Sequence, residues 1–143
     1  MRVADGGRVG PMDPVLHLSI VVGDLEASRR FYVDTLGCRP GRTHEGWMDV
    51  WFCGLQLTLQ HQPGHVLPPE AQGSRHFGVT LDADGFQATV HRLQASPEVA
   101  WIVPVTTDYA GTSRQQTKCK VADPSGNVLE FKTYLDPGAA FAP

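Results

Sequence analysis

One pattern occurs twice in the chain: a short strand-like segment that carries a histidine and is followed by a helix-like segment. The first copy is Leu16-His17-Leu18-Ser19-Ile20-Val21-Val22, and the second is Arg75-His76-Phe77-Gly78-Val79-Thr80-Leu81. Because successive side chains of a strand point to opposite faces, each histidine is predicted to share a face with small or polar residues while the other face is apolar. The repeat predicts two related units, each opening with a histidine-bearing strand.

A later strand in each copy carries a second polar group. In Leu55-Gln56-Leu57-Thr58-Leu59, Gln56 lies opposite the leucines; in Val128-Leu129-Glu130-Phe131-Lys132, Glu130 lies opposite Leu129 and Phe131. Glu130 follows its histidine by 54 residues and Gln56 follows its own by 39, so the second copy has 15 additional residues. We assign them to the loop around Tyr109.

The other elements are predicted from capping and periodicity. Asp24 can cap a helix that begins at Leu25 and stops at Gly37, and a second helix is expected around Phe86, Val90 and Leu93. Further strands are expected at 38–40, 47–52, 101–105 and 115–121, with a loop over 106–113. In 47–52, one face holds two tryptophans and an aspartate and the other holds Met, Val and Phe, so either face could be core.

The chain is predicted to form one compact domain. We expect a flexible leader over residues 1–14, a first unit over 15–61, a linker rich in Pro and Gly over 62–73, a second unit over 74–134 and a tail over 135–143. Its 143 residues, 41% apolar and 19% charged, are ordinary for a globular protein.

Composition also excludes several classes of partner. The net charge of −3, with scattered basic residues, argues against nucleic acid and anionic membranes as partners. No apolar run approaches the roughly 18 residues of a membrane span, and no secretion signal is evident, so a cytoplasmic location is expected. Cys38, Cys53 and Cys119 lack C-x-x-C spacing and are expected to be reduced, mostly buried thiols.

These motifs resemble those of the vicinal oxygen chelate superfamily. The resemblance rests on the two histidine strands, on Val22-Gly23-Asp24-Leu25, Phe31-Tyr32 and Leu36-Gly37, and on Asp123-Pro124-Ser125-Gly126-Asn127 leading into Glu130; it runs from Leu16 to Tyr134. The superfamily includes glyoxalase I, extradiol dioxygenases, fosfomycin-resistance thiol transferases, methylmalonyl-CoA epimerase and bleomycin-binding proteins. The resemblance implies an α+β fold in which two β-α-β-β-β units form a half-open, mixed β-sheet cup, and it implies a homodimer.

His17, His76 and Glu130 are the predicted metal ligands. Two imidazoles and one carboxylate can hold a divalent metal and leave positions open, the arrangement favoured by non-haem Fe(II). Fe2+ is therefore expected, with Mn2+, Ni2+ or Zn2+ as alternatives, and a small-molecule substrate would chelate the metal through two neighbouring oxygens. A lone strand histidine is more often an ordinary core residue, but three such residues in matching positions of a repeat favour a site.

Gln56 is a departure from the pattern of the resemblance. Glyoxalase I usually has a glutamate at the matching position, whereas Gln56 cannot ionise and offers the metal only a carbonyl oxygen, or a hydrogen bond to a ligand. A proton shuttle of two carboxylates is therefore missing, which leaves Glu130 as the catalytic base.

Extradiol dioxygenases, by the same resemblance, use a further histidine and a tyrosine. His61 and Tyr109 are the candidate catalytic residues, although either could equally be a surface residue. The first hypothesis is thus a small extradiol-type ring-cleaving dioxygenase. The alternatives are a glyoxalase-like lyase or isomerase, a thiol transferase, or a metal-free drug-binding protein of the bleomycin-resistance kind.

Three cations, Arg114, Lys118 and Lys120, alternate along one predicted strand. They could bind an anionic group of a substrate, or they could be ordinary solvated charges.

Overall fold

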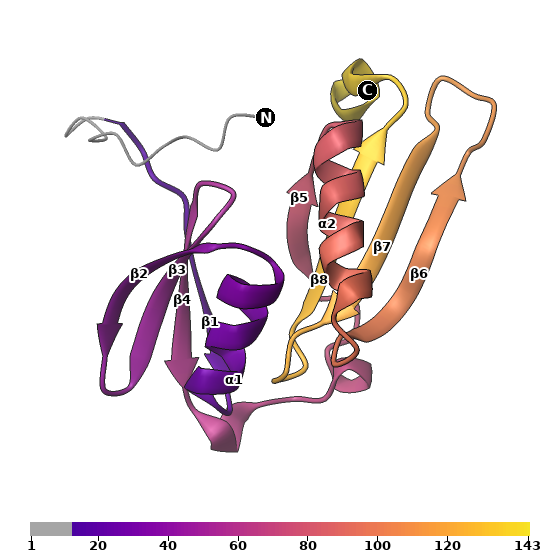
Figure 1. Cartoon of the computed structure of the whole chain (residues 1–143). Helices are drawn as coiled ribbons and strands as arrows, with labels where there is room; N and C mark the ends of the chain where they lie inside the picture. The colour runs from indigo at the N-terminus through magenta and orange to yellow at the C-terminus, as the bar shows by residue number, and fades with distance from the viewer. Residues whose placement is uncertain (1–12) are drawn as a thin grey trace. The chain divides into compact units, whose positions relative to one another are not determined.

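The structure is a computed structural model that describes residues 13–143. The predicted leader over 1–14 therefore lies almost entirely outside the described residues. The chain divides into two compact units, Met1–Val66 and Leu67–Pro143 (Figure 1). The predicted linker over 62–73 holds two short 3-10 helices, Pro63–His65 and Pro69–Ala71.

The described residues of the first unit form a four-stranded sheet, a helical segment after the first strand and the 3-10 helix Pro63–His65. Its strands lie in the order β1-β4-β3-β2, with β1 parallel to β4 and the other neighbours antiparallel. The elements are β1 (His17–Val22), α1 (Leu25–Arg29), β2 (Arg39–His44), β3 (Trp47–Phe52) and β4 (Leu55–His61). A π-helical stretch, Arg30–Thr35, continues α1.

The start and stop of this helical segment follow the predicted signals. The carboxylate of Asp24 accepts a hydrogen bond from the backbone amide of Ala27 at 2.9 Å, which confirms the predicted cap. Gly37 has φ of +78°, a conformation that glycine adopts without strain, and it ends the segment as predicted. The π-helical winding of the second half was not predicted.

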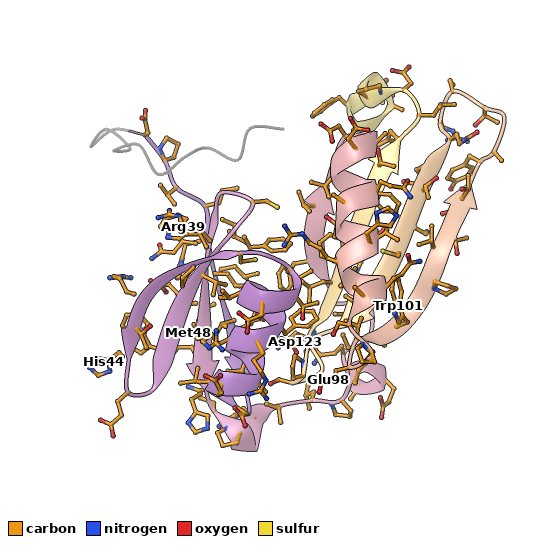
Figure 2. The ribbon with its side chains drawn as sticks, viewed as in Figure 1. Arg39, His44, Met48, Glu98, Trp101 and Asp123 are labelled. Atoms are coloured by element: carbon orange, nitrogen blue, oxygen red, sulfur yellow. The ribbon has the colours of Figure 1, made fainter. Side chains whose placement is uncertain are left out.

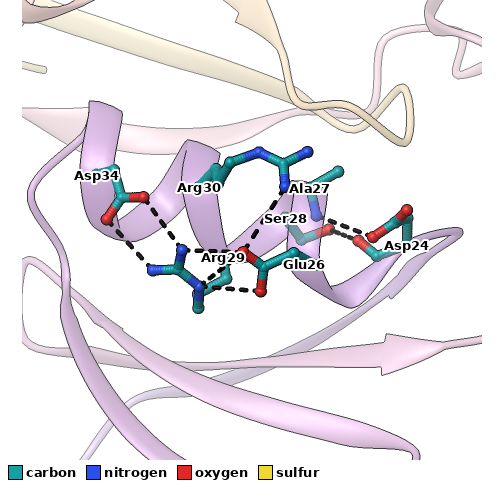
Figure 3. A network of polar contacts seen from close by, with 7 residues as sticks. All are labelled: Asp24, Glu26, Ala27, Ser28, Arg29, Arg30 and Asp34. Atoms are coloured by element: carbon teal, nitrogen blue, oxygen red, sulfur yellow. Dashed lines mark hydrogen bonds and ion pairs between the residues drawn. The ribbon is translucent and has the colours of Figure 1, made fainter.

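Exposed ion pairs follow the same segment (Figure 3). Arg29 lies between Glu26, at 3.0 Å, and Asp34, at 3.3 Å. Pairs this exposed add little to stability, so the segment depends on its buried side.

The structure shows which face of β3 belongs to the core of the first unit. Met48, Val50 and Phe52 are buried on the helix side of the sheet with Phe31 and Tyr32 (Figure 2 labels Met48). The tryptophans of β3 therefore lie on the opposite face. In each unit, the face of the sheet that is turned away from the helix is called the open face.

The second unit repeats the β-α-β-β-β order and confirms the predicted α+β fold. Its sheet order is β5-β8-β7-β6, with β5 parallel to β8. The elements are β5 (Phe77–Thr80), α2 (Ala83–Ala95), β6 (Ala100–Asp108), β7 (Gln116–Ala122) and β8 (Val128–Tyr134). A 3-10 helix, Pro137–Phe141, lies in the predicted tail.

The core of this unit lies between α2 and the apolar face of its sheet. Phe86, Val90 and Leu93 are buried, as the helical spacing predicts, and they cover the face that holds Leu129 and Phe131 of β8 (Figure 1).

Two predicted boundaries in this unit were wrong. β6 runs on to Asp108, where a loop was expected from residue 106, because Thr106, Thr107 and Asp108 still pair with β7. Arg114 lies in the loop before β7 and not on the strand.

The cysteines differ from the prediction as well. All three are among the described residues and form no disulfide, but only Cys119 is buried; Cys38 is half-buried and Cys53 is exposed. Cys53 is exposed because it sits in the β3–β4 turn. Burial, together with the nearby charge of Glu130, raises the pKa of Cys119 to about 11.

No helix among residues 13–143 is long and apolar enough to cross a membrane.

Gly78 permits the close approach of β5 to β8. It pairs directly with Glu130, and a Cβ atom at position 78 would overlap the backbone carbonyl group of Glu130. The glycine thus lets the strand that follows His76 lie against the strand that carries Glu130.

We predict that Gly78→Ala lowers the free energy of unfolding by about 2 kcal/mol or more, because the new methyl group must push two paired strands apart. Gly46→Ala is the control, since a Cβ there meets no atom within 4 Å, and it should change stability by less than about 0.5 kcal/mol. Denaturant unfolding measures both. Equal stability of the two variants would contradict the close approach.

Candidate functional site

The open face of the first sheet carries two rows of polar and aromatic residues. His17 of β1, Gln56 of β4 and Trp51 of β3 are paired across the sheet, and Ser19, Thr58 and Asp49 form the next row. Residues paired in this way point to the same face of a sheet. His17 and Gln56, two predicted ligands, are therefore neighbours.

The ring of His17 has a defined orientation. Its Nδ1 lies 3.1 Å from the backbone carbonyl oxygen of Gln56. Because a carbonyl oxygen can only accept, Nδ1 must donate, and in the neutral ring Nε2 keeps its lone pair. Histidines that bind metals are commonly held in this way through the other ring nitrogen.

The open face of the second sheet brings His76 and Glu130 into contact. Nε2 of His76 lies 2.8 Å from Oε2 of Glu130, and Nζ of Lys120 lies 3.7 Å from the same oxygen. Lys120 and Glu130 are also paired across β7 and β8. The Glu130 side chain is 14% exposed.

The ring of His76 is held at both nitrogens. Its Nδ1 donates to the backbone carbonyl oxygen of Ser74 at 2.8 Å, while Nε2 faces the carboxylate of Glu130. Nε2 and the carboxylate of Glu130 thus face each other, and a divalent cation would bind the same two atoms in place of this contact. The donor set of the pair, one imidazole and one carboxylate, fits such a cation.

Asp49 organises the centre of the first face, and the sequence analysis did not identify it. The carboxylate is 2% exposed. Its Oδ1 accepts from the hydroxyl of Thr58 at 2.6 Å, and its Oδ2 accepts from Nε of Arg42 at 2.9 Å and from Nε2 of Gln56 at 3.1 Å. Burial raises the pKa of Asp49, but these hydrogen bonds outweigh it, so the pKa lies below its usual value.

The tryptophans on this face are already covered by cations. The guanidinium of Arg39 lies 5.4 Å from the ring of Trp51, and that of Arg42 lies 5.3 Å from the ring of Trp47. His44 stacks on Trp47 with ring centroids 5.8 Å apart; Figure 2 labels Arg39 and His44 in the first unit. A planar substrate would compete with these groups for the ring faces that they cover.

His61 is not grouped with the predicted ligands of its unit. It lies five residues after Gln56 on β4, so its side chain points to the other face. Its Nε2 contacts the backbone oxygen of Gly23 at 3.2 Å.

Tyr109 is likewise away from Glu130. It follows Asp108, the last residue of β6, which pairs with Gln116 of β7; Gln116 in turn pairs with Tyr134 of β8. Tyr134 lies four residues, about 13 Å, along β8 from Glu130, and Tyr109 lies beyond that row of the sheet. Tyr109 has φ of +55° and packs under the guanidinium of Arg114 at 5.1 Å.

Lys118 and Lys120 share the face of Glu130, but both have carboxylate partners. Nζ of Lys118 lies 2.6 Å from Asp108, and that hydrogen bond raises the pKa of Lys118. The sequence analysis left open whether these cations bind an anionic group or are solvated; both lysines are partly exposed and contact carboxylates of their own unit.

The predicted ligands form two pairs, one in each unit: His17 with Gln56, and His76 with Glu130. Within neither unit do three His, Cys, Asp or Glu side chains of the described residues group as a metal site. The first unit contributes no anionic ligand of its own, because Gln56 is neutral.

A family model matches most of the chain. The model of the Glyoxalase/Bleomycin resistance protein/Dioxygenase superfamily matches residues 15–131. No curated protein matches the chain.

Solved structures match over nearly the whole chain. A glyoxalase/bleomycin resistance protein/dioxygenase from Alicyclobacillus acidocaldarius is 26% identical, with a TM-score of 0.74, and the match covers 89% of this chain and 96% of that one. The fosfomycin resistance protein FosX from Listeria monocytogenes is 11% identical, with a TM-score of 0.67, over 85% and 93% of the two chains. An oxidase, ChaP-H2, is 21% identical, with a TM-score of 0.65, over 89% and 99%. The last two show a shared fold only.

We predict that Thr58→Val lowers the free energy of unfolding by about 1.5–3 kcal/mol at pH 7, because Asp49 loses a hydrogen bond to its charged form. The hydroxyl lowers the pKa of Asp49, so its contribution is present above the unfolded-state pKa and is lost as the pH falls through the lower folded-state pKa.

Denaturant unfolding from pH 7 down to pH 2 should therefore show the deficit of the variant shrinking in acid. Thr80→Val, at an exposed position of β5, is the control and should have little effect. A deficit that does not change with pH would contradict an ionised, hydrogen-bonded Asp49.

Proposed function

The chain belongs to the Glyoxalase/Bleomycin resistance protein/Dioxygenase superfamily, and we propose that it is a metal-dependent enzyme of the vicinal oxygen chelate type. His17, His76 and Glu130 would hold one divalent ion, Fe2+ first among the candidates, with the carbonyl oxygen of Gln56 as a weak fourth ligand. When bound, such an ion supplies a Lewis acid for two neighbouring oxygens of a substrate and, as Fe2+, a centre for oxygen chemistry.

The orientation of the two histidines carries this proposal. Each donates from Nδ1 to a backbone carbonyl oxygen, His17 to Gln56 and His76 to Ser74, and each presents Nε2 on the open face of its sheet. His61, in contrast, uses Nε2 for its backbone contact. The two histidines that open the repeat thus share an arrangement typical of metal ligands.

Glu130 would be both a ligand and the base. Its Oε2 lies 2.8 Å from Nε2 of His76 on the open face, where the same oxygen could accept a proton from a substrate. The ammonium of Lys120 compensates part of the carboxylate charge from 3.7 Å. Lys120 and His76 together hold the carboxylate on the open face.

Ring-cleaving dioxygenation of the extradiol type is the reaction that we propose first. Two imidazoles and one carboxylate are the ligand set of non-haem Fe(II) oxygenases. Gln56 lacks the second carboxylate that proton transfer of the glyoxalase type would use.

A glyoxalase-like lyase or isomerase, or a thiol transferase, is the second candidate. The positions of His61 and Tyr109 favour it, because neither lies beside the predicted ligands of its own unit. Glu130 would then transfer protons alone.

We predict that the full-length chain, reconstituted anaerobically with Fe2+ and desalted, retains about one metal ion per chain by mass spectrometry. His17→Ala and Glu130→Gln should lose it, because each removes a proposed ligand. His91→Ala, at an exposed position of α2, should retain it. No uptake of Fe2+ or Zn2+ by the unchanged chain would contradict the proposal and favour a metal-free binding protein.

We predict that the iron-loaded chain consumes oxygen when a catechol is added, with a yellow ring-cleavage product. An oxygen electrode and visible absorption measure this, with Glu130→Gln as the control. Metal retention without catechol turnover would favour the second candidate, a glyoxalase-like lyase or isomerase or a thiol transferase, over the dioxygenase.

A further inference from the structure

We propose that Asp49 is a positioning residue that sets the amide of Gln56, so that Gln56 presents its carbonyl oxygen, and not its NH2 group, on the open face beside His17. The inference rests on the proposed function, because that oxygen is meant for the metal. It assigns a role to a buried carboxylate that is not itself a ligand.

The hydrogen bonds around Asp49 determine the orientation of the amide. Nε of Arg42 can only donate, and it points at Oδ2 of Asp49, so this oxygen is an acceptor. The group of Gln56 that lies 3.1 Å from the same oxygen must then also be a donor, which identifies it as Nε2. Oε1 is therefore the atom of the amide that is turned away from Asp49.

Burial makes this orientation firm. Asp49 is 2% exposed, and Thr58 donates to its other oxygen at 2.6 Å. Turning the amide over would place Oε1 against a nearly buried carboxylate that already has a full set of donors. Unpaired charge and lone-pair repulsion in such a place are costly.

The same contact accounts for glutamine at position 56. A glutamate there would bring a second carboxylate to about 3 Å from Asp49 in a poorly solvated place, and two carboxylates so close do not both ionise readily. Asp49 and Gln56 are thus a matched pair: a neutral amide can donate to the buried carboxylate where a second carboxylate could not.

Gln56 also connects Asp49 to His17. The backbone oxygen of Gln56 accepts from Nδ1 of His17, while its side chain donates to Asp49. A change at position 49 therefore alters which atom of its side-chain amide, oxygen or nitrogen, Gln56 presents on the open face. It leaves the hydrogen bond between His17 and the backbone oxygen of Gln56 in place.

Cobalt binding tests the inference. The visible absorption of Co2+ added to the full chain gives its affinity, and Asp49→Asn should weaken binding about 10–100-fold. The reason is that an asparagine can donate to Oε1 and let the Gln56 amide turn over. Asp34→Asn is the matched control, an exposed aspartate of the same unit, and should bind Co2+ as the unchanged chain does.

Rescue separates positioning from a purely structural role. In Asp49→Asn combined with Gln56→Glu, the amide of residue 49 can donate to one oxygen of the new carboxylate and leave the other for the metal, so Co2+ affinity should return. A structural role of Asp49 predicts no return.

A metal-free measurement tests the pair itself. Gln56→Glu alone should shift the unfolding equilibrium constant at pH 7 by about fivefold or more towards the unfolded chain, and much less when Asp49→Asn is present. In the unchanged chain, the side-chain amide protons of Gln56 should exchange with water more slowly than those of the exposed Gln94. This exchange measurement stands even if Asp49→Asn does not fold.

The outcomes are distinct. Co2+ binding that is equal in the unchanged chain and in folded Asp49→Asn, or full tolerance of Gln56→Glu beside Asp49, would overturn the inference and leave the proposed function standing. Absence of Co2+ binding by the unchanged chain would overturn the proposed function, and with it the metal role of Gln56.

Discussion

The parallel pairing of the first and last strands in each unit is the constraint on which the candidate site depends. It sets His17 beside Gln56 in one sheet and Gly78 beside Glu130 in the other. Because this pairing fixes which side chains share a face, a slip of one residue would send Gln56 or Glu130 to the helix side. Gly78 has no side chain, which permits the close approach; the backbone oxygens that orient the two histidines come from Gln56 of β4 and from Ser74 in the turn before β5.

Features with a local signal could be predicted from the sequence. The alternation of side chains placed His17, His76, Gln56 and Glu130 on open faces, and Asp24 marked the start of its helix. Features set by distant partners could not be predicted. From the sequence either face of β3 could be core, and only packing against the helical segment shows that Met48, Val50 and Phe52 are core. The Asp49 cluster depends on the register of β3 against β4.

The charges on the two open faces suggest what a substrate would need. In the proposed centre, Glu130 is the only anionic ligand and Gln56 is neutral, so a divalent ion would keep a net positive charge. Asp49 lies close by, but Arg42 compensates its charge. A substrate that binds as an anion through two neighbouring oxygens would offset this charge. The pairing of Asp49 with Gln56 thus favours an anionic chelating substrate.

The central claim is that His17 and His76 each keep Nδ1 on a backbone carbonyl oxygen and offer Nε2 to one metal ion. Two-bond 1H–15N NMR of the uniformly labelled chain, titrated with Zn2+, measures this directly. The account predicts that both Nε2 resonances change on adding one equivalent of Zn2+ while both Nδ1 nitrogens stay protonated. Unchanged Nε2 resonances, or a metal on Nδ1, would contradict it.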